Sequence, residues 1–98
     1  MLEIRKTQAF SNWLDELRDI QGRARVMARI ERLASGNAGD AAPVGEGVSE
    51  LRIHIGPGYR VYYKRCGEQL IVLLAGGDKS TQTKDIGLAL DLARGLEE

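Results

Sequence analysis

Apolar residues in the first third of the chain recur at the spacing of helices. The opening residues 2–5 alternate apolar and charged side chains, which predicts a short strand. A stripe of apolar residues then predicts a helix of about three turns that Thr7 caps and Gly22 ends. The stripe consists of Phe10, Trp13, Leu14, Leu17 and Ile20.

A second apolar stripe predicts another helix, which runs to about Ser35 and is ended by Gly36. Its members are Val26, Met27, Ile30, Leu33 and Ala34. Two consecutive amphipathic helices with a short break between them predict a helical hairpin.

The apolar period changes to two at Val48, and this change predicts β-strands in the second half of the chain. Residues 50–64 predict a β-hairpin that turns at the Gly-Pro-Gly of positions 56–58. After a tight turn at 66–68, the continuous apolar run 70–75 predicts a central strand covered on both faces and ended by the glycines 76–77. The stretch 37–47 predicts a loop that carries a short strand near Val44.

A last stripe at helical spacing predicts a C-terminal helix that Ser80 or Thr81 caps. Its members are Ile86, Ala89, Leu90, Ala93 and Leu96. The predicted order of elements is β-α-α-(β)-β-β-β-α. This order indicates an α+β fold, in which an N-terminal strand and a helical hairpin pack on a mostly antiparallel sheet with a C-terminal helix.

The composition fits one folded domain over residues 1–98, with 43% hydrophobic and 29% charged residues. Cys66 is the one cysteine, so no internal disulfide can form, and a reducing compartment is expected. The sequence shows no signal peptide and no apolar run long enough to span a bilayer. We therefore expect a cytoplasmic protein without a membrane partner.

Basic residues are unevenly distributed, although the formal net charge is zero. Zero net charge argues against a generic nucleic-acid binder. Between Arg52 and Lys84, however, there are six arginines and lysines against two acidic residues. A second basic cluster places Arg25, Arg29 and Arg32 on one helical face, which is either an ordinary solvated face or a contact for an RNA backbone or a partner.

Pleat alternation gathers polar side chains on one face of the predicted hairpin, namely Glu50, Arg52, His54, Arg60, Tyr62 and Lys64. Cross-strand neighbours lie about 5 Å apart, so the cations repel one another unless an anion lies between them. Glu50 can neutralise one cation, and a phosphate can neutralise two more, because a guanidinium group bonds two oxygens at once. Lys79 can join from the next strand. The alternative is a strand face that carries charges because it is solvated.

These residue types match the needs of metal-independent RNA cleavage. Attack of a 2′-hydroxyl on the adjacent phosphorus requires a base, cations around the phosphorane and an acid for the leaving oxygen. His54, the one histidine, is the candidate acid or base, and Tyr62 is a candidate platform on which a base stacks. Glu50 and Lys64 are further candidate RNA-binding residues. One histidine and one cysteine do not make a usual zinc site, and no phosphate-binding loop is present, so we expect neither a metal nor a cofactor.

The segments ELRIHIGPGYRVYYKR, at positions 50–65, and LLAGGDKSTQTKDI, at positions 73–86, resemble the RelE/ParE superfamily of bacterial toxins. The likeness is greatest to the branch called addiction-module killer or HigB-like proteins and extends over nearly the whole chain. It implies a RelE-like fold and a type II toxin that cuts mRNA in the ribosomal A site without a metal, and so inhibits translation.

The resemblance also implies site residues. The two strand lysines of RelE-type toxins fall on Arg52 and His54, the arginine after the turn falls on Arg60, and the arginine beyond the last strand falls on Lys79. The tyrosine that RelE uses near its C-terminal end has no counterpart here, since Asp85 occupies about that place. Either Tyr62 or His54 takes over the role, or the chemistry is weaker. The C-terminal His-Asp-Tyr cluster of other HigB members is also absent.

The partners implied by the resemblance are the ribosome, mRNA and a cognate helix-turn-helix antitoxin. The complex would contact DNA only through the antitoxin. Two other functions remain open from the sequence. One is a ParE-like inhibitor of DNA gyrase, and the other is a degenerate toxin that only binds its antitoxin.

Overall fold

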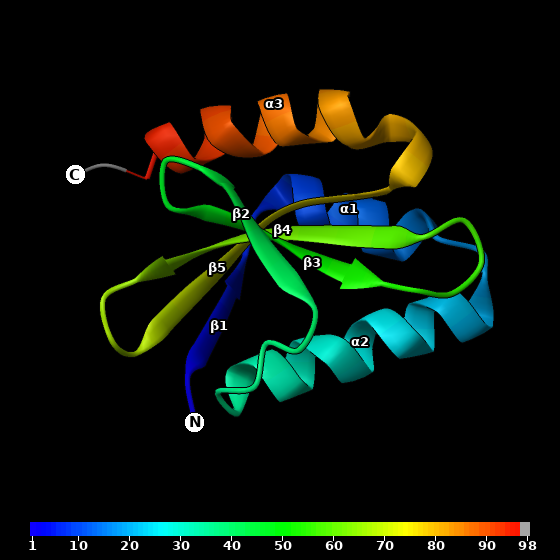
Figure 1. The fold of residues 1–98 in the computed structure, drawn as a ribbon, viewed down its shortest axis with the longest axis horizontal. Coiled ribbons are helices and arrows are strands. Elements are labelled where there is room, and N and C mark those ends of the chain that lie inside the picture. Colours follow the sequence, from blue (N-terminus) through cyan, green and yellow to red (C-terminus); the bar gives the residue numbers. More distant parts are fainter. Residues whose placement is uncertain (97–98) are drawn as a thin grey trace.

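A five-stranded sheet carries helices on both of its faces in the computed structural model, which describes residues 1–96 (Figure 1). The elements in chain order are β1 (Glu3–Lys6), α1 (Gln8–Glu16), α2 (Ile20–Ala34), β2 (Ala41–Gly45), β3 (Val48–Ile53), β4 (Tyr59–Cys66), β5 (Leu70–Asp78) and α3 (Gln82–Arg94). A single 3-10 turn, Lys79–Thr81, joins β5 to α3. Within the described residues, no helix is both long and apolar enough to cross a membrane.

The strands lie in the order β1-β5-β4-β3-β2 across the sheet. β1 runs parallel to β5, and the other neighbouring pairs are antiparallel. The predicted α+β class with a mostly antiparallel sheet is therefore confirmed, as is the short strand near Val44, which is β2. The apolar run 70–75 lies in β5, between β1 and β4, where both faces of the strand are covered.

Two apolar layers form, one on each face of the sheet. The layer under α1 and α2 consists of Phe10, Leu14, Val26, Leu33, Leu51, Ile53, Tyr59, Val61, Tyr63, Ile71 and Leu73. The layer under α3 consists of Val48, Tyr62, Val72, Leu74, Ala75, Ala89 and Ala93. Because α3 covers part of the second face, some side chains of the β3–β4 hairpin that point to that face are shielded from solvent.

The break between the first two helices lies earlier than the apolar stripe predicts. α1 ends at Glu16, and Ile20 opens α2 with 82% of its surface exposed. Gly22 does not end a helix, since it lies in the first turn of α2 and donates its N–H to the capping carboxylate of Asp19 at 3.1 Å. The predicted cap at Thr7 is confirmed, because its hydroxyl accepts the N–H of Phe10 at 3.0 Å.

The glycines 76–77 continue β5 instead of ending it. A Cβ on Gly76 would overlap the ring of Trp13 in α1, and a Cβ on Gly77 would overlap the carboxylate of Asp85 in α3. These positions therefore serve close packing from both faces, not a turn.

The start of α3 also differs from the prediction. Thr81 precedes the helix but makes no capping hydrogen bond, and its hydroxyl donates instead to Asp85 at 2.5 Å. The carboxylate of Asp78 caps the preceding 3-10 turn by accepting the N–H of Ser80 at 2.8 Å. The predicted cap of the helix by Ser80 or Thr81 is thus wrong, because the 3-10 turn leads directly into the helix.

The Gly22→Ala variant is expected to be destabilised, although alanine is normally the better helix former. Its Cβ would overlap the ring of Tyr59 and lie 2.6 Å from Asp19 Oδ2. Overpacking of this kind costs about 1–3 kcal/mol. Gly87→Ala in α3 is the matched control, since nothing lies within 4 Å of its Cβ position. Gly87→Ala should gain about 0.5–1 kcal/mol of stability. Urea unfolding should therefore show changes of opposite sign in the free energy of unfolding of the two variants. Equal changes in the free energy of unfolding of the two variants would contradict the close packing of Gly22 against Tyr59 and Asp19.

Candidate functional site

The polar face of the β3–β4 hairpin leads to a hollow at the hairpin turn. The register pairs Arg52 with Arg60 and Glu50 with Tyr62, which places these four side chains on the face that the pleat predicts. The hollow has a volume of about 370 Å³ and is lined by His54, Ile55, Gly56, Pro57, Gly58, Arg60 and Lys79. Three of the four predicted catalytic side chains therefore share one hollow.

Gly58 allows the hollow to form between the turn and the start of the 3-10 turn. Its φ of 80° lies in the left-handed region, which glycine adopts without strain. A Cβ there would lie 3.5 Å from Arg60 Nη1 and 3.5 Å from Lys79 Cβ. These are ordinary van der Waals distances, so the left-handed φ, not a lack of room, is what requires glycine here.

The carboxylate of Glu50 lies beneath the arginines and is only 1% exposed. Its Oε1 accepts a hydrogen bond from Arg52 Nε at 3.0 Å. Its Oε2 accepts hydrogen bonds from Tyr62 Oη at 3.1 Å and from Gln82 Nε2 at 2.5 Å. Arg60 Nε lies 3.8 Å from the same oxygen. Glu50 is therefore the buried counter-charge of the two strand arginines, as predicted for at least one of them.

The ionisation of Glu50 depends on these partners. Burial raises the pKa of its carboxyl group, but the hydrogen bonds from Arg52, Gln82 and Tyr62 and the charge of Arg60 outweigh burial. The pKa of Glu50 consequently lies below its usual value. Burial and the neighbouring Glu50 charge raise the pKa of Tyr62, so this phenol stays protonated as a hydrogen-bond donor.

Arg60 is buried, with 7% of its surface exposed, yet the protein satisfies it only in part. Its Nη1 donates to the carbonyl oxygens of Gly58 and Tyr59, both at 3.2 Å. Its Nε is buried without a hydrogen-bond partner within residues 1–96. Arg29 Nε is buried in the same state, so this feature alone does not mark a ligand site. Arg60 Nε faces Glu50 Oε2 at 3.8 Å, and the guanidinium group can therefore meet an anion in the hollow only through Nη2, which makes no hydrogen bond within residues 1–96.

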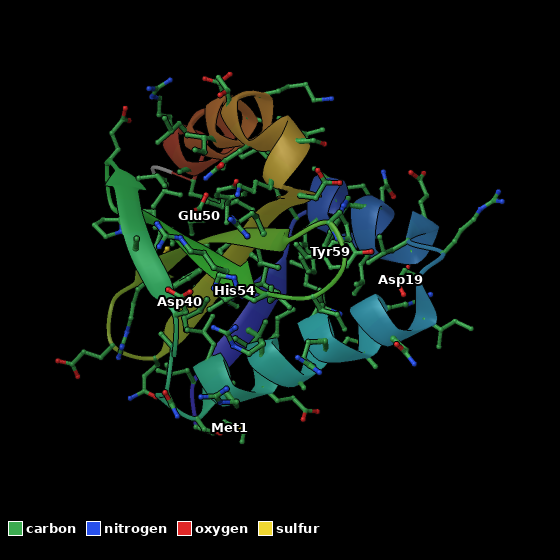
Figure 2. The ribbon with its side chains drawn as sticks, turned by 45° about the vertical axis from the view of Figure 1, so that its right-hand side comes forward. Met1, Asp19, Asp40, Glu50, His54 and Tyr59 are labelled. Atoms are coloured by element: carbon green, nitrogen blue, oxygen red, sulfur yellow. The ribbon has the colours of Figure 1, made fainter. Side chains whose placement is uncertain are left out.

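His54 and Arg52 meet a carboxylate that the sequence patterns do not reveal, that of Asp40 (Figure 2). His54 Nε2 bonds to Asp40 Oδ2, and Arg52 Nη1 lies 3.7 Å from Asp40 Oδ1. The hydrogen bond from His54 lowers the pKa of Asp40 the most, and the charges of His54, Arg52 and Arg29 lower it further. The His54 side chain remains 67% exposed.

Arg29 is an internal brace, and its predicted role in contacting RNA is wrong. It is 9% exposed and points from α2 to the start of the β2–β3 region. Its Nη1 donates to the carbonyl oxygen of Arg52 at 2.5 Å. Its Nη2 donates to the carbonyl oxygens of Ala38 at 2.9 Å and Asp40 at 3.3 Å. Arg29 thereby ties the loop before β2 to the end of β3.

Tyr62 and Glu50 are also unable to contact RNA as predicted. Tyr62 is fully buried in the layer under α3, so its ring offers no platform for a base. Glu50 is covered by the same helix through Gln82. Both side chains act on the site indirectly. Glu50 holds the two strand arginines, and Tyr62 donates a hydrogen bond to Glu50.

The remaining predicted contacts lie outside the hollow. Arg25 and Arg32 are exposed on α2, and Lys64 pairs in register with Val48, toward the far end of β4 from the turn. Contact of these three residues with RNA stays a prediction.

A partly buried hydrogen bond fixes the turn to the helical hairpin. Tyr59 Oη donates to Asp19 Oδ2 at 2.7 Å, between the start of β4 and the cap of α2 (Figure 2). Burial and the neighbouring carboxylate raise the pKa of Tyr59 to about 12. The backbone N–H of Gly22 and then the Tyr59 hydroxyl lower the pKa of Asp19. The turn that forms one wall of the hollow is therefore held from the opposite face of the sheet.

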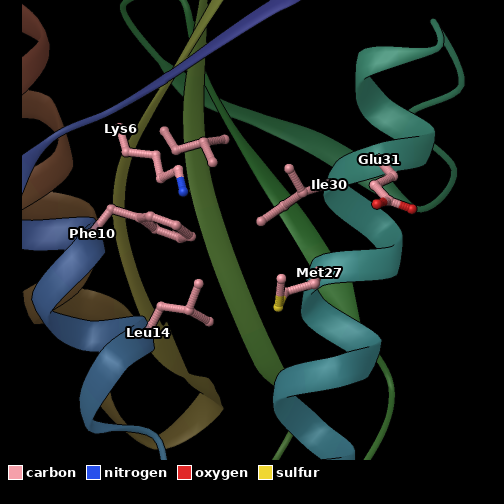
Figure 3. Close-up of a pocket in the computed structure, with 7 residues that line it drawn as sticks. Lys6, Phe10, Leu14, Met27, Ile30 and Glu31 are labelled. Atoms are coloured by element: carbon pink, nitrogen blue, oxygen red, sulfur yellow. The ribbon is translucent and has the colours of Figure 1, made fainter.

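A second hollow has a different character. It has a volume of about 110 Å³ between α1 and α2 (Figure 3) and is lined by Lys6, Phe10, Leu14, Met27, Ile30, Glu31 and Leu73. Its walls are mostly apolar, so it offers little to a phosphate. Among the described residues, no group of three or more histidine, cysteine, aspartate or glutamate side chains is arranged to hold a metal ion.

The fold built around this site occurs in a solved toxin structure. A copper-bound mutant toxin from Helicobacter pylori superposes with a TM-score of 0.60 and 18% sequence identity, over 82% of this chain and 97% of the other. The two chains therefore share an α+β fold.

A closer relative comes from Haemophilus influenzae. This protein, named only as an uncharacterized protein, is 48% identical over 95 residues, which is 97% of this chain and 96% of the relative. The chain belongs to the same protein family as this Haemophilus protein. No family model matches the chain.

Proposed function

We propose that the protein is the toxin of a type II toxin–antitoxin system, from the addiction-module killer or HigB-like branch of the RelE/ParE superfamily. Its activity is that of a metal-independent endoribonuclease that cuts mRNA in the ribosome and so inhibits translation. The observation that carries the proposal is the hollow at the β3–β4 turn, where Arg60 is buried, incompletely bonded and next to Lys79 and His54. The fold shared with the Helicobacter pylori toxin supports it.

The hollow suits a phosphodiester group. Arg60 can donate to two phosphate oxygens, and Lys79 adds a point charge from the other wall. Their positive charges stabilise the phosphorane, in which negative charge builds up on the non-bridging oxygens. Arg52 is half-exposed but is already bonded to Glu50 and Asp40, so its role is to keep these carboxylates away from the phosphate.

His54 is the base of the proposed reaction. It takes the proton of the 2′-hydroxyl while the 2′-oxygen forms a bond to phosphorus. The bond from phosphorus to the 5′-oxygen breaks, and its electron pair stays on that oxygen, which takes a proton from water. The His54 imidazolium then gives the proton that it took from the 2′-hydroxyl to water. The products are a 2′,3′-cyclic phosphate and a 5′-hydroxyl.

The proposed partners are the ribosome, the mRNA and a helix-turn-helix antitoxin, which keeps the toxin inactive and alone contacts DNA. The exposed arginines of α2, Arg25 and Arg32, are the proposed contacts for ribosomal RNA. The apolar hollow between α1 and α2 has no role in the proposed chemistry.

Induction of the protein in growing bacteria, followed by mapping of the 5′ ends of messages, tests the proposal. We expect growth to stop and new 5′ ends to appear within the codons of translated messages. A reporter message whose start codon is removed is the control, and it should stay intact. Growth arrest with intact messages and double-strand breaks in DNA would indicate a gyrase inhibitor. Normal growth with antitoxin binding retained would indicate a degenerate toxin.

A further inference from the structure

Asp40 belongs to the site, although it lies in a loop rich in glycine and alanine that no sequence pattern marks as functional. Its backbone carbonyl oxygen is held near the end of β3 by two hydrogen bonds. Its carbonyl oxygen accepts the N–H of Arg52 at 2.9 Å and Arg29 Nη2 at 3.3 Å, and Arg29 also bonds the carbonyl oxygens of Ala38 and Arg52. These bonds fix the backbone from which the Asp40 side chain extends.

The carboxylate of Asp40 is directed at His54. Asp40 Oδ2 bonds His54 Nε2, while Oδ1 faces Arg52 Nη1 at 3.7 Å (Figure 2). The bond uses one ring nitrogen of His54 and leaves Nδ1 without a hydrogen-bond partner within residues 1–96. His54 also lines the hollow that contains Arg60 and Lys79.

We propose that Asp40 is a positioning residue, which holds His54 through Nε2 so that Nδ1 is the atom that accepts the proton from the 2′-hydroxyl. This inference rests on the proposed function. A carboxylate bonded to one ring nitrogen keeps the proton of the neutral imidazole on that nitrogen, which leaves a lone pair on the other. It also stabilises the imidazolium that forms when Nδ1 takes the proton.

The first measurement tests the contact without relying on cleavage. Carbon-13 NMR of the Asp40 carboxyl group should give a pKa below the usual range in the wild-type protein, because His54 is the largest cause of its lowering. The pKa should rise toward its ordinary value in His54→Ala and stay low in Lys84→Ala, which removes an exposed cation of α3. An unchanged pKa in His54→Ala would overturn the inference.

The second measurement tests the role through rates of cleavage on translating ribosomes. His54→Ala should slow cleavage by about 10²-fold or more, and Asp40→Asn by about tenfold. The double variant should be no slower than His54→Ala, since a positioning residue has nothing to position once the imidazole is gone. Asp15→Asn, which removes an exposed carboxylate of α1, should match the wild type.

The outcomes separate the two proposals. Independent losses in the double variant, or wild-type rates for Asp40→Asn, would overturn the role of Asp40 and leave the nuclease function standing. Absence of cleavage by the wild-type protein would overturn the nuclease function and the role of Asp40 with it. Asp40→Asn should fold normally, because the three backbone bonds near residue 40 do not involve its side chain.

Discussion

Replacing Arg60 with alanine is expected to slow cleavage of translated mRNA by about 10²- to 10³-fold. The guanidinium group lies at the wall of the hollow, and its Nε is buried without a hydrogen-bond partner in the part of the chain that the structure describes. In the proposed reaction it donates to the phosphate oxygens where charge builds up. Alanine removes both the charge and the donors at this point.

Loss of folding can be separated from loss of activity. Glu50 keeps its hydrogen bonds from Arg52, Tyr62 and Gln82 when Arg60 is absent, so the variant should stay folded, with a measurable thermal transition. Arg65→Ala is the matched control on the same strand, because Arg65 is exposed and donates to a loop carbonyl oxygen.

Arg60→Lys refines this test. Lysine keeps the positive charge but lacks the planar fork that bonds two oxygens, so its activity should lie between those of the wild type and Arg60→Ala. Wild-type rates in a folded Arg60→Ala protein would show that the hollow is not the site of cleavage.

Glu50→Gln is expected to cause the largest loss of stability, about 3 kcal/mol. The replacement keeps the size of the side chain but removes the negative charge shared by Arg52 and Arg60. The amide group would also present donors to Tyr62 Oη and Gln82 Nε2, which now donate to Glu50. Leaving the buried Arg60 without its counter-charge costs more than losing an exposed ion pair.

The pH dependence of this loss follows from the lowered pKa of Glu50. A carboxyl group with a lowered pKa in the folded state stabilises the protein above the unfolded pKa, about 4.3 for glutamate. That contribution is lost as the pH falls through the lower folded pKa. The free energies of unfolding of the wild type and Glu50→Gln should therefore differ most near pH 7 and converge in acid.

Denaturant unfolding between pH 2 and pH 7 measures this difference. Glu68→Gln, an exposed glutamate in the β4–β5 turn, is the control and should stay within about 0.5 kcal/mol of the wild type. A difference between wild type and Glu50→Gln that is constant with pH would contradict the ionised state of Glu50.

The sequence predicts the hairpin well because pleat alternation depends only on the order of residues. It places Arg52 and Arg60 on the polar face, with Leu51 and Val61 on the other, and the register, which pairs Arg52 with Arg60, agrees with this. It does not reveal that Tyr62 and Glu50 are buried, since their exposure depends on where α3 lies. An alternating pattern separates the two faces of a strand but does not say which of them another element covers.

The contacts of Asp40 and Arg29 show a second limit of prediction from the sequence. Their contacts join segments that are distant in the chain, and no local period encodes them. One signal is present in the sequence: Gly45, Glu46 and Gly47 form a short turn between β2 and β3. Taken as a hairpin turn, it sets the register that pairs Ala41 with Leu51 and so brings residue 40 close to Arg52.

Cleavage in a reconstituted system is the sharpest test of the proposed nuclease activity. Purified protein would be added to ribosomes that hold a defined mRNA with an empty A site. We expect one cut within the A-site codon, with a 2′,3′-cyclic phosphate and a 5′-hydroxyl at the new ends, and cutting slowed by about 10²- to 10³-fold with Arg60→Ala. An intact message, or equal cutting of the same mRNA without ribosomes, would contradict it.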